Sequence, residues 1–408
     1  MKNDVWPKEF PGTHWYDNQE EEAVCDVLRR GAPFRYYGLK EPRHVTLFEE
    51  RAKTMYGVNY ALGVNSGTGA LITAMAAFGI GPGDEVIIPA FMWIATVAAI
   101  INANAIPVIC EVDDSFTLDP EDLERKITDR TALIVAVHMA GAPTDMDAIM
   151  DIALQHGLPV LEDVAQCNGG SFGSAKLGTI GDAGIFSLQI NKNITAGEGG
   201  LAVTNNEAVY RRLVAAHDVG HLWINGSPTE TTPDVLMWGS GRRMSEMTGA
   251  VAAIQITKLS TIVSHMRASH DRIAGQITEI PGVSLRRLTD PDGHTGPFII
   301  IILENEEKAF TAAQAMKDAG LYSIFRLADY GLHIYCNIPQ LVNKTPLSNA
   351  GNPWNLPANS GRDYRYEKGT CPKSDELFAR SILIPIPSRL TPEQEQWAVE
   401  TIKASISG

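Results

Sequence analysis

The chain has 408 residues, of which 44% are hydrophobic and 20% charged, and its formal net charge is −14. This length predicts two domains rather than one compact core. The negative charge argues against a nucleic-acid-binding protein, because neutralising phosphates requires clustered lysine and arginine. The five cysteines are widely scattered and none has metal-ligand spacing, so we expect no metal site, a poor disulfide framework and a reducing compartment.

The N-terminus lacks an apolar core of signal-peptide length. Residues 86–110 contain no charge and are long enough to span a bilayer. However, two prolines and two asparagines interrupt this stretch, and "VIIP" and "PVIC" are typical of short buried strands. We therefore predict a cytoplasmic protein without a membrane span.

Strands and helices alternate from about residue 58 onward. The apolar runs of the expected strands are continuous, as in strands that are covered on both faces. This pattern predicts an α/β fold with a mostly parallel sheet and helices on both sides. The expected strands are 59–64, 84–90, 106–112, 131–139 and 158–165, and the expected helices are 68–79, 95–104, 119–127 and 145–157.

The alternation stops near residue 183. Strands 183–189 and 200–204 are separated by a glycine-rich turn with no helix, which predicts an antiparallel pair. A long helical pattern covers about 245–280. The polar stretch 343–369 is a long loop of the kind that usually caps a site, and a capping box at Thr391 predicts the start of the last helix.

Three strand ends carry residues that could bind a ligand. "VNSGTGAL", residues 64–71, offers small residues, helix amides and the Thr68 hydroxyl to an anion, or is only a tight turn. Asp163 and Gln166 follow a parallel strand, at the edge where α/β sheets bind ligands. A buried carboxylate there needs a cationic partner, unless Asp163 is a helix cap. Trp93 could stack on a planar ring or belong to the core.

Lys192 lies in "FSLQINKNITAGEGG", residues 186–200, among uncharged neighbours. Burial would lower the pKa of its amine and allow a Schiff base with an aldehyde, although an exposed hairpin lysine is the simpler alternative. Anion cradle, stacking aromatic, buried carboxylate and Schiff-base lysine are together the parts that a pyridoxal phosphate site requires.

With these parts in order, the chain resembles the DegT/DnrJ/StrS sugar aminotransferases over nearly its whole length. The matching stretches are "VNSGTGAL", "VIIPAFMWIAT", "NAIPVICEVD", "VHMAGAPTDMDAI", "VLEDVAQCNGGSFGSAKLGTIGDAGIFS" and "KNITAGEGGLAVT". The resemblance implies a fold type I pyridoxal phosphate-dependent transferase and a homodimer with shared active sites. It implies a large domain with an N-terminal arm at 1–260, and a smaller C-terminal α+β domain at 261–408 that includes the capping loop.

The resemblance also implies roles for individual residues. Lys192 looks like the lysine that binds the cofactor aldehyde, Asp163 like the partner of the ring nitrogen, and Gln166 like the contact to the ring hydroxyl. A histidine at the lysine position marks relatives that are dehydratases, so Lys192 argues against that activity. The other implied cofactor contacts are the stacking residue Trp93 and the phosphate ligands Gly67, Thr68 and Ser187.

One motif departs from the family. The family often has Gly-x-Asn-x-Arg before the long helix, and its asparagine reaches the phosphate in the other subunit. Here the stretch is "GSGRRMSEMTGA", so Gly241 replaces the asparagine, Arg243 keeps the arginine place and Arg242 adds a second charge. The cross-subunit phosphate contact is therefore in doubt.

The expected reaction is transfer of an amino group from glutamate or glutamine to a keto sugar, with pyridoxamine phosphate as the other form of the cofactor. Residues 329–344 and 366–386 resemble a subgroup that includes 8-amino-3,8-dideoxy-octulosonate transaminases. Arg242, Arg243 and Arg326 could bind an acidic keto sugar of that type, or could make ordinary salt bridges. The alternatives are a nucleotide-linked keto sugar, a pyridoxamine phosphate-dependent dehydratase and a cofactor-binding regulator without turnover.

Overall fold

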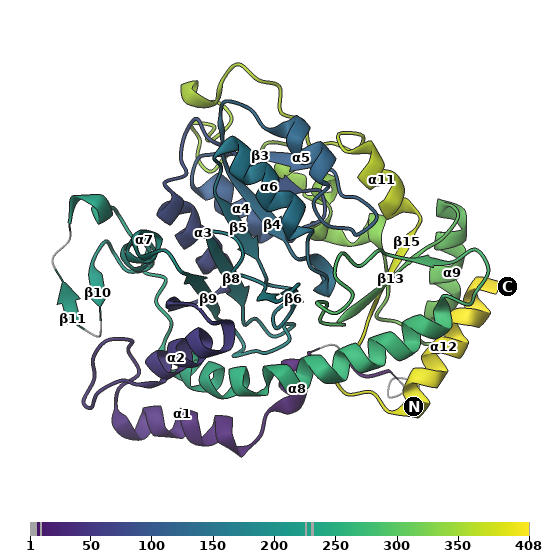
Figure 1. The fold of residues 1–408 in the computed structure, drawn as a ribbon, viewed down its shortest axis with the longest axis horizontal. Coiled ribbons are helices and arrows are strands. Elements are labelled where there is room, and N and C mark those ends of the chain that lie inside the picture. Colours follow the sequence, from purple (N-terminus) through teal and green to yellow (C-terminus); the bar gives the residue numbers. More distant parts are fainter. Residues whose placement is uncertain (1–5, 9, 225–226, 230–231, 408) are drawn as a thin grey trace.

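The computed structural model describes residues 6–8, 10–224, 227–229 and 232–407. Its two main sheets have seven and four strands, and the long helix α8 (Glu246–Ile277) runs below both of them in Figure 1. Part of the N-terminal stretch that was searched for a signal peptide, residues 1–5, lies outside the described residues.

The seven-stranded sheet has the order β1-β9-β8-β5-β4-β2-β3. Strands β8, β5, β4, β2 and β3 run parallel, whereas β9 pairs antiparallel with both β8 and β1. The predicted mostly parallel sheet and the antiparallel pair after residue 183 are confirmed. The strands are β1 (Tyr60–Val64), β2 (Glu85–Pro89), β3 (Ile106–Cys110), β4 (Thr131–Val137), β5 (Val160–Asp163), β8 (Ala183–Ser187) and β9 (Gly200–Thr204).

Helices cover both faces of this sheet, as the continuous apolar strands predicted. In β2, Val86 and Ile88 pack into one core and Ile87 into another, because alternate side chains of a strand point to opposite faces. One face packs against α3 (Gly67–Phe78), α4 (Ile94–Asn102) and α7 (Glu207–His217). The other packs against α5 (Pro120–Lys126), α6 (Met146–His156), α2 (His44–Tyr56) and α8, and α1 (Asn18–Arg30) lies outside them.

The second sheet is antiparallel, with the order β12-β13-β15-β14. Its strands are β12 (Ser284–Leu285), β13 (Phe298–Ile302), β14 (Phe325–Arg326) and β15 (Ser381–Pro385), and it packs with α9 (Glu306–Asp318) and α12 (Pro392–Ser407). The capping box before α12 is present, since Thr391 and Gln394 exchange hydrogen bonds. The expected domain boundary at 260/261 falls inside α8, and the division stays a prediction.

Short elements join these layers. They are the strands β6 (Ser171–Phe172), β7 (Ala175–Lys176), β10 (Leu222–Ile224) and β11 (Ser227–Thr229), and the helices α10 (Pro339–Val342) and α11 (Pro372–Ala379). The 3₁₀ helices are η1 (Gly12–Trp15), η2 (Met139–Gly141), η3 (Pro233–Val235), η4 (Leu327–Asp329), η5 (Gly331–His333), η6 (Tyr335–Asn337) and η7 (Pro357–Asn359).

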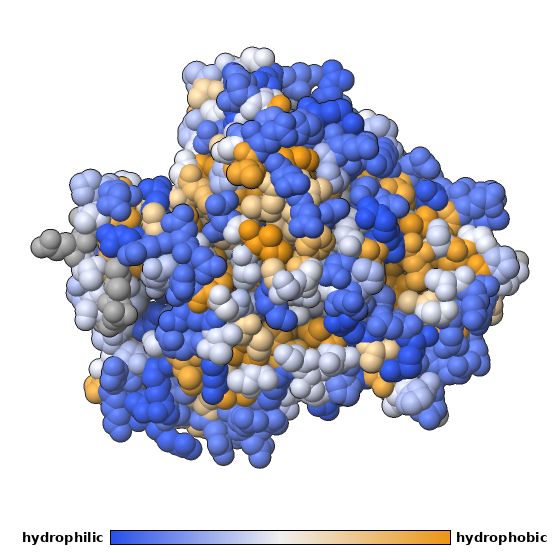
Figure 2. Space-filling view, viewed as in Figure 1, coloured by the Kyte–Doolittle hydropathy of each residue, from blue (hydrophilic) through white to orange (hydrophobic). Residues whose placement is uncertain are grey.

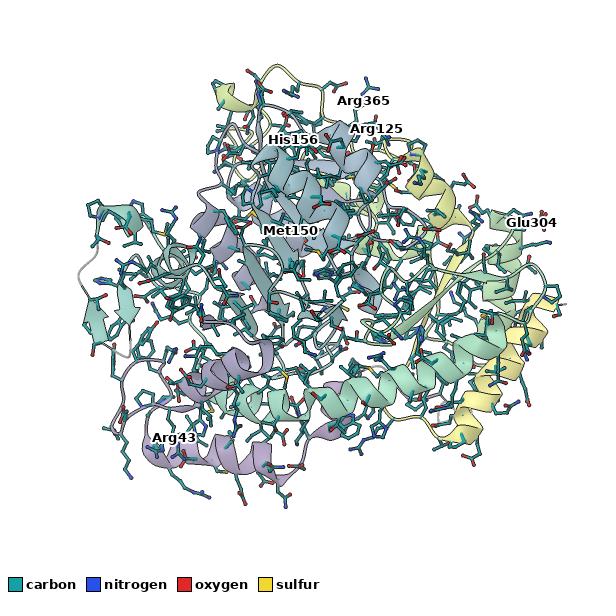
Figure 3. The ribbon with its side chains drawn as sticks, viewed as in Figure 1. Arg43, Arg125, Met150, His156, Glu304 and Arg365 are labelled. Atoms are coloured by element: carbon teal, nitrogen blue, oxygen red, sulfur yellow. The ribbon has the colours of Figure 1, made fainter. Side chains whose placement is uncertain are left out.

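The long loop 343–369 packs against the amino ends of the parallel strands. Gly83 before β2 donates to Asn359 over 2.7 Å, and Tyr366 donates to the carbonyl of Pro107 in β3 over 3.0 Å. In Figure 3 its labelled residue Arg365 projects at the edge of the molecule away from α8, and hydrophilic residues cover this edge in Figure 2. The amino ends lie opposite the carboxyl ends where a ligand was expected, and no residue of this loop lines the cavity of the same chain, so its capping role stays a prediction.

The uncharged stretch 86–110 forms β2, α4 and β3, as its prolines and asparagines predicted. Within the described ranges, no helix combines the length and the apolar character needed to cross a bilayer.

Candidate active site

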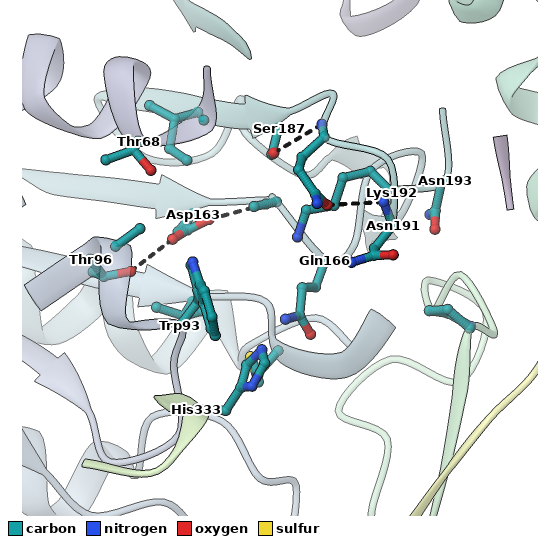
Figure 4. Close-up of a pocket in the computed structure, with 18 of the residues that line it drawn as sticks. Thr68, Trp93, Thr96, Asp163, Gln166, Ser187, Asn191, Lys192, Asn193 and His333 are labelled. Carbon is teal, nitrogen blue, oxygen red and sulfur yellow. Dashed lines mark hydrogen bonds between the residues drawn. The ribbon is translucent and has the colours of Figure 1, made fainter. Parts of the chain in front are cut away.

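A cavity of about 380 Å³ opens at the carboxyl ends of the parallel strands. This is the edge where open α/β sheets bind ligands. The cavity is shown in Figure 4, and segments after β1, β2, β4, β5 and β8 contribute to its wall. All seven residues that the sequence singled out as cofactor contacts line it: Gly67, Thr68, Trp93, Asp163, Gln166, Ser187 and Lys192.

Asp163 ends β5 and is buried at the floor of the cavity. Its carboxylate accepts hydrogen bonds from the Thr96 hydroxyl (3.1 Å) and the Ala165 amide (3.1 Å). Burial raises the pKa of this carboxyl, against the opposing effects of these hydrogen bonds and of the charge of Lys192. In the protein alone, burial thus disfavours the ionised form of Asp163. A cation within the cavity would reverse this effect, and the carboxylate is placed to bind one.

Lys192 lies five residues after β8, in the turn that precedes β9. Burial lowers the pKa of its amine, whereas the carboxylates of Asp163 and Glu198 act in the opposite direction. Its main chain is fixed on both sides, by a bond from its amide to the Gln189 carbonyl (3.0 Å) and one from the Gly12 amide to its own carbonyl (3.3 Å). Among the described residues the amine itself has no hydrogen-bond partner, so it is available for a reaction in the cavity.

The first turn of α3 forms one end of the cavity. Ser66 caps the helix by accepting a hydrogen bond from the Gly69 amide (2.9 Å). A Cβ atom at Gly67 would lie 2.7 Å from the Cβ of Ser187, so only glycine allows α3 and β8 to approach this closely. The free amides of the helix start, the Thr68 hydroxyl and Ser187 thus surround a space suited to an anion.

Trp93 and Gln166 supply a flat face and an amide. Trp93 precedes α4, and its side chain is 43% exposed, into the cavity that it lines. The side-chain oxygen of Gln166 accepts a hydrogen bond from the Ala140 amide (3.1 Å). A planar ring in the cavity would therefore have an aromatic neighbour and an amide donor within the same wall.

Sequence reasoning missed Tyr330 and His333, which also line the cavity. The two rings stack with centroids 4.1 Å apart, and the imidazole lies 4.6 Å from the Trp93 ring. Burial, followed by the charge of Lys192, lowers the pKa of His333 to about 4, so its imidazole is neutral at physiological pH. The only signal was that both residues lie in the stretch 329–344 that carried a family resemblance.

The three predicted substrate arginines do not line the cavity. Arg243 is paired with Asp218, and Arg326 with Asp329 (2.6 Å) and Glu306 (3.6 Å). Arg242 lies beside α3, where its Cδ would be 3.6 Å from a Cβ at Gly69. The structure thus shows ordinary salt bridges for Arg243 and Arg326, which was the alternative to their binding an acidic sugar.

One group of metal-ligating residues occurs within the described ranges, away from the cavity. His270, Asp271 and His294 bring one possible ligand atom each within 4.8 Å of one another. Oδ1 of Asp271 is hydrogen-bonded to Nδ1 of His270 (2.9 Å) and lies 3.2 Å from Nε2 of His294. Burial, followed by the charge of His270 and against that of Asp271, lowers the pKa of His294 to about 3, so its imidazole is neutral at physiological pH.

Comparison with known proteins places these features in context. A model of the DegT/DnrJ/EryC1/StrS aminotransferase family matches residues 17–327. The chain is 35% identical over 286 residues to L-glutamine:2-deoxy-scyllo-inosose aminotransferase of Streptomyces fradiae, covering 68% of this chain and 65% of that enzyme. It is 36% identical over 223 residues to L-glutamine:scyllo-inosose aminotransferase of Streptomyces griseus, covering 53% and 52%. The chain thus spans less than two thirds of the length of these curated relatives.

Solved structures match over nearly the whole chain. 3-Amino-5-hydroxybenzoic acid synthase superimposes with a TM-score of 0.81 at 25% identity, and the match covers 98% of both chains. An aminotransferase from Psychrobacter cryohalolentis gives the same values. The large mixed sheet and the smaller C-terminal sheet therefore form the same fold as in these two proteins.

Proposed function

Because the chain belongs to the DegT/DnrJ/EryC1/StrS aminotransferase family, we propose that it transfers an amino group from glutamine or glutamate to the keto group of a sugar or cyclic polyol. The cofactor is pyridoxal 5′-phosphate. The single observation that carries this proposal is that one cavity holds both a buried carboxylate, Asp163, and a lysine amine, Lys192, that has no hydrogen-bond partner in the described part of the chain.

The residues present fit this cofactor. Ser187, Thr68 and the start of α3 would hold the phosphate, because the missing Cβ of Gly67 leaves the close approach that an anion cradle needs. The raised pKa of the buried Asp163 carboxyl marks a place for a cation, which a protonated ring nitrogen would fill. Trp93 would lie against the ring, and Gln166 would donate to its hydroxyl oxygen.

Pyridoxal phosphate supplies an aldehyde that takes up an amino group and a ring that withdraws electrons. The protein supplies the proton transfer. Burial lowers the pKa of the Lys192 amine and so favours its neutral form, which can accept a proton from the substrate carbon and return it elsewhere. Asp163 would stay ionised beside the protonated ring nitrogen, and the neutral His333 offers a hydrogen bond without adding charge.

The substrate that we propose is an uncharged polyhydroxy ketone. The ionisable residues that line the cavity are Asp163, Lys192, Glu198, Tyr330 and His333, and no arginine is among its described lining residues. Neutral amides at Gln189, Asn191 and Asn193 could bind hydroxyl groups. The printed names of the curated relatives, which are inosose aminotransferases, favour the same class. The acidic octulosonate-type sugar is the second candidate, supported by the resemblance of residues 329–344 and 366–386.

A half-reaction assay separates these substrates. The pyridoxamine form of the enzyme is mixed with a keto-inositol, an acidic octulosonate-type keto sugar or a nucleotide-linked keto sugar, and the return of aldehyde absorbance is followed. We expect the keto-inositol to react with a second-order rate constant at least about tenfold above the acidic sugar, because an unpaired carboxylate costs 1.4 kcal/mol or more. A faster reaction of the acidic or nucleotide-linked sugar would reverse the proposed order.

We also propose a homodimer, with active sites completed by the partner. Large apolar side chains are exposed in one chain, with Trp238 at 95%, Leu39 at 92% and Leu236 at 77%. A partner surface would remove them from water. Leu236 and Trp238 lie five and three residues before Gly241, the position at which the family's asparagine reaches the other subunit's phosphate.

Replacing Gly241 with asparagine is expected to tighten cofactor binding by roughly two- to tenfold, the equivalent of one added hydrogen bond. Gly241 has a φ of 64°, which asparagine tolerates better than most residues, and a Cβ there meets no atom within 4 Å. The measurement is titration of the unloaded enzyme with pyridoxal phosphate, with Gly241→Ala as the matched variant that adds a Cβ without an amide. Equal affinities of the two variants would argue against a missing phosphate contact.

A further inference from the structure

Arg286, just after β12, is a buried guanidinium whose partners are backbone carbonyls. It is 6% exposed and donates to the carbonyl oxygens of Met139 (3.1 Å) and Ala140 (2.5 Å). No carboxylate pairs with it in the part of the chain that the structure describes. Burial lowers its pKa to about 10, so it is still charged at neutral pH. Burying a charge without a counter-ion costs folding free energy, so the burial of Arg286 is expected to serve a specific purpose.

The turn that Arg286 contacts is held by the whole segment around it. Besides the two carbonyls bound by Arg286, Gly141 accepts from the Thr295 amide (2.8 Å) and Pro143 accepts from the Thr289 hydroxyl (2.7 Å). Four carbonyls of the turn 139–143, which follows β4 of the large sheet, are therefore fixed by residues of the β12–β13 connection in the small sheet.

This turn has a conformation that it would not adopt readily alone. Ala140 has φ 52° and ψ 39°, in the left-handed region that residues with a Cβ rarely occupy. Gly141 follows with φ 77°, and a Cβ on it would lie 2.3 Å from Pro297. The carbonyl bonds to Arg286 thus stabilise a backbone conformation that the local sequence disfavours.

The left-handed turn orients Gln166. The Ala140 amide donates to the side-chain oxygen of Gln166, so that oxygen is occupied. The amide nitrogen of Gln166, which can only donate, is then the atom left for a ligand. Figure 4 shows the Gln166 side chain projecting into the cavity near Lys192 and Trp93.

We propose that Arg286 is a positioning residue, which holds the turn 139–141 so that Gln166 presents a hydrogen-bond donor to the ring oxygen of the cofactor. The inference rests on the proposed function, because it requires the cofactor to occupy the cavity. By this proposal, Arg286, which is buried next to the small sheet, affects the electronic state of a cofactor bound at the edge of the large sheet.

The test is a pH titration of the absorbance of the cofactor-loaded enzyme. A hydrogen bond donated to the ring oxygen stabilises the deprotonated form of the enzyme-bound cofactor. Loss of that hydrogen bond therefore makes the titrating proton of the cofactor harder to remove. We expect Arg286→Met to raise the midpoint of the titration by about half a unit to one unit. Gln166→Ala should raise it in the same way, and the double variant should show no further shift.

Arg287→Met is the matched control, because Arg287 is partly exposed and pairs with Asp113 and Asp114 instead of the turn. Its midpoint should equal that of the wild type. If Arg286→Met does not fold, Arg286→Lys, which keeps the charge but can reach both carbonyls only poorly, should give a shift in the same direction. An unchanged midpoint in the folded variant, or an equal shift when Gln166 is already alanine, would overturn the proposal. A wild-type enzyme without any cofactor absorbance would overturn the proposed function itself, and this inference with it.

Discussion

Replacing Lys192 with alanine is expected to abolish multiple turnover while the protein stays folded and still binds pyridoxal phosphate. Proton transfer by a positioned side chain contributes about 10²–10⁴-fold to a rate, and here the same amine also binds the aldehyde, so the loss should be at the upper end or beyond. The fold should survive because the Lys192 amine has no hydrogen-bond partner among the described residues, and its main-chain bonds to Gln189 and Gly12 do not depend on the side chain.

Two measurements check this expectation. Borohydride treatment of the wild type followed by peptide mapping should place the cofactor on Lys192, and the Lys192→Ala enzyme should release its cofactor on denaturation without a covalent label. Lys176→Ala is the control, because Lys176 is an exposed lysine on β7 that does not line the cavity. A label found on any other lysine would remove Lys192 from the proposed chemistry.

Replacing Asp163 with asparagine should lower kcat by at least about 10²–10³-fold, because the ring nitrogen would lose the charge that keeps it protonated. The fold should be kept, since an asparagine can still accept from the Ala165 amide and can donate to the Thr96 hydroxyl. Burial raises the pKa of the Asp163 carboxyl, so its ionised form is unfavourable in the cofactor-free protein. The melting temperature of cofactor-free Asp163→Asn should therefore equal or exceed that of the wild type.

Steady-state kinetics with saturating cofactor, together with thermal unfolding of the cofactor-free protein, separate the two effects. A variant that is slow but equally stable supports the electrostatic role. If Asp163→Asn turned over at nearly the wild-type rate, the carboxylate would not control the ring, whatever its position in the cavity.

The sequence predicted the floor of the cavity because that floor consists of strand ends. Asp163 and Ser187 are the last residues of parallel strands, and Trp93 lies four residues after a third. The carboxyl ends of parallel strands meet at one edge, so the order of elements alone was enough to bring these residues together. Gly67 could be assigned for a similar reason, since it begins the helix that follows β1.

Other parts depended on contacts that no local pattern records. His333 reaches the cavity because its segment pairs with the backbone after β2, where Met92 donates to the His333 carbonyl (3.0 Å) across more than two hundred residues. The polar composition of loop 343–369 predicted exposure, but it could not distinguish the amino edge of the sheet from the carboxyl edge. The sequence could not decide between a substrate contact and a salt bridge for Arg326, because the ion pair with Glu306 depends on a contact across 20 residues.

The helix α8 has a consequence for cooperativity. At about 1.5 Å per residue its 32 residues extend about 48 Å. Its first half contributes Ile256 and Leu259 to the core below the large sheet, and its second half contributes Ile273 and Ile277 to the core of the small one. Each core is complete only with the residues of α8. Unfolding of either end of this helix would therefore expose apolar surface in an element on which the other core also depends. We therefore expect the two sheets to unfold in one cooperative transition, because α8 contributes to the apolar core of each.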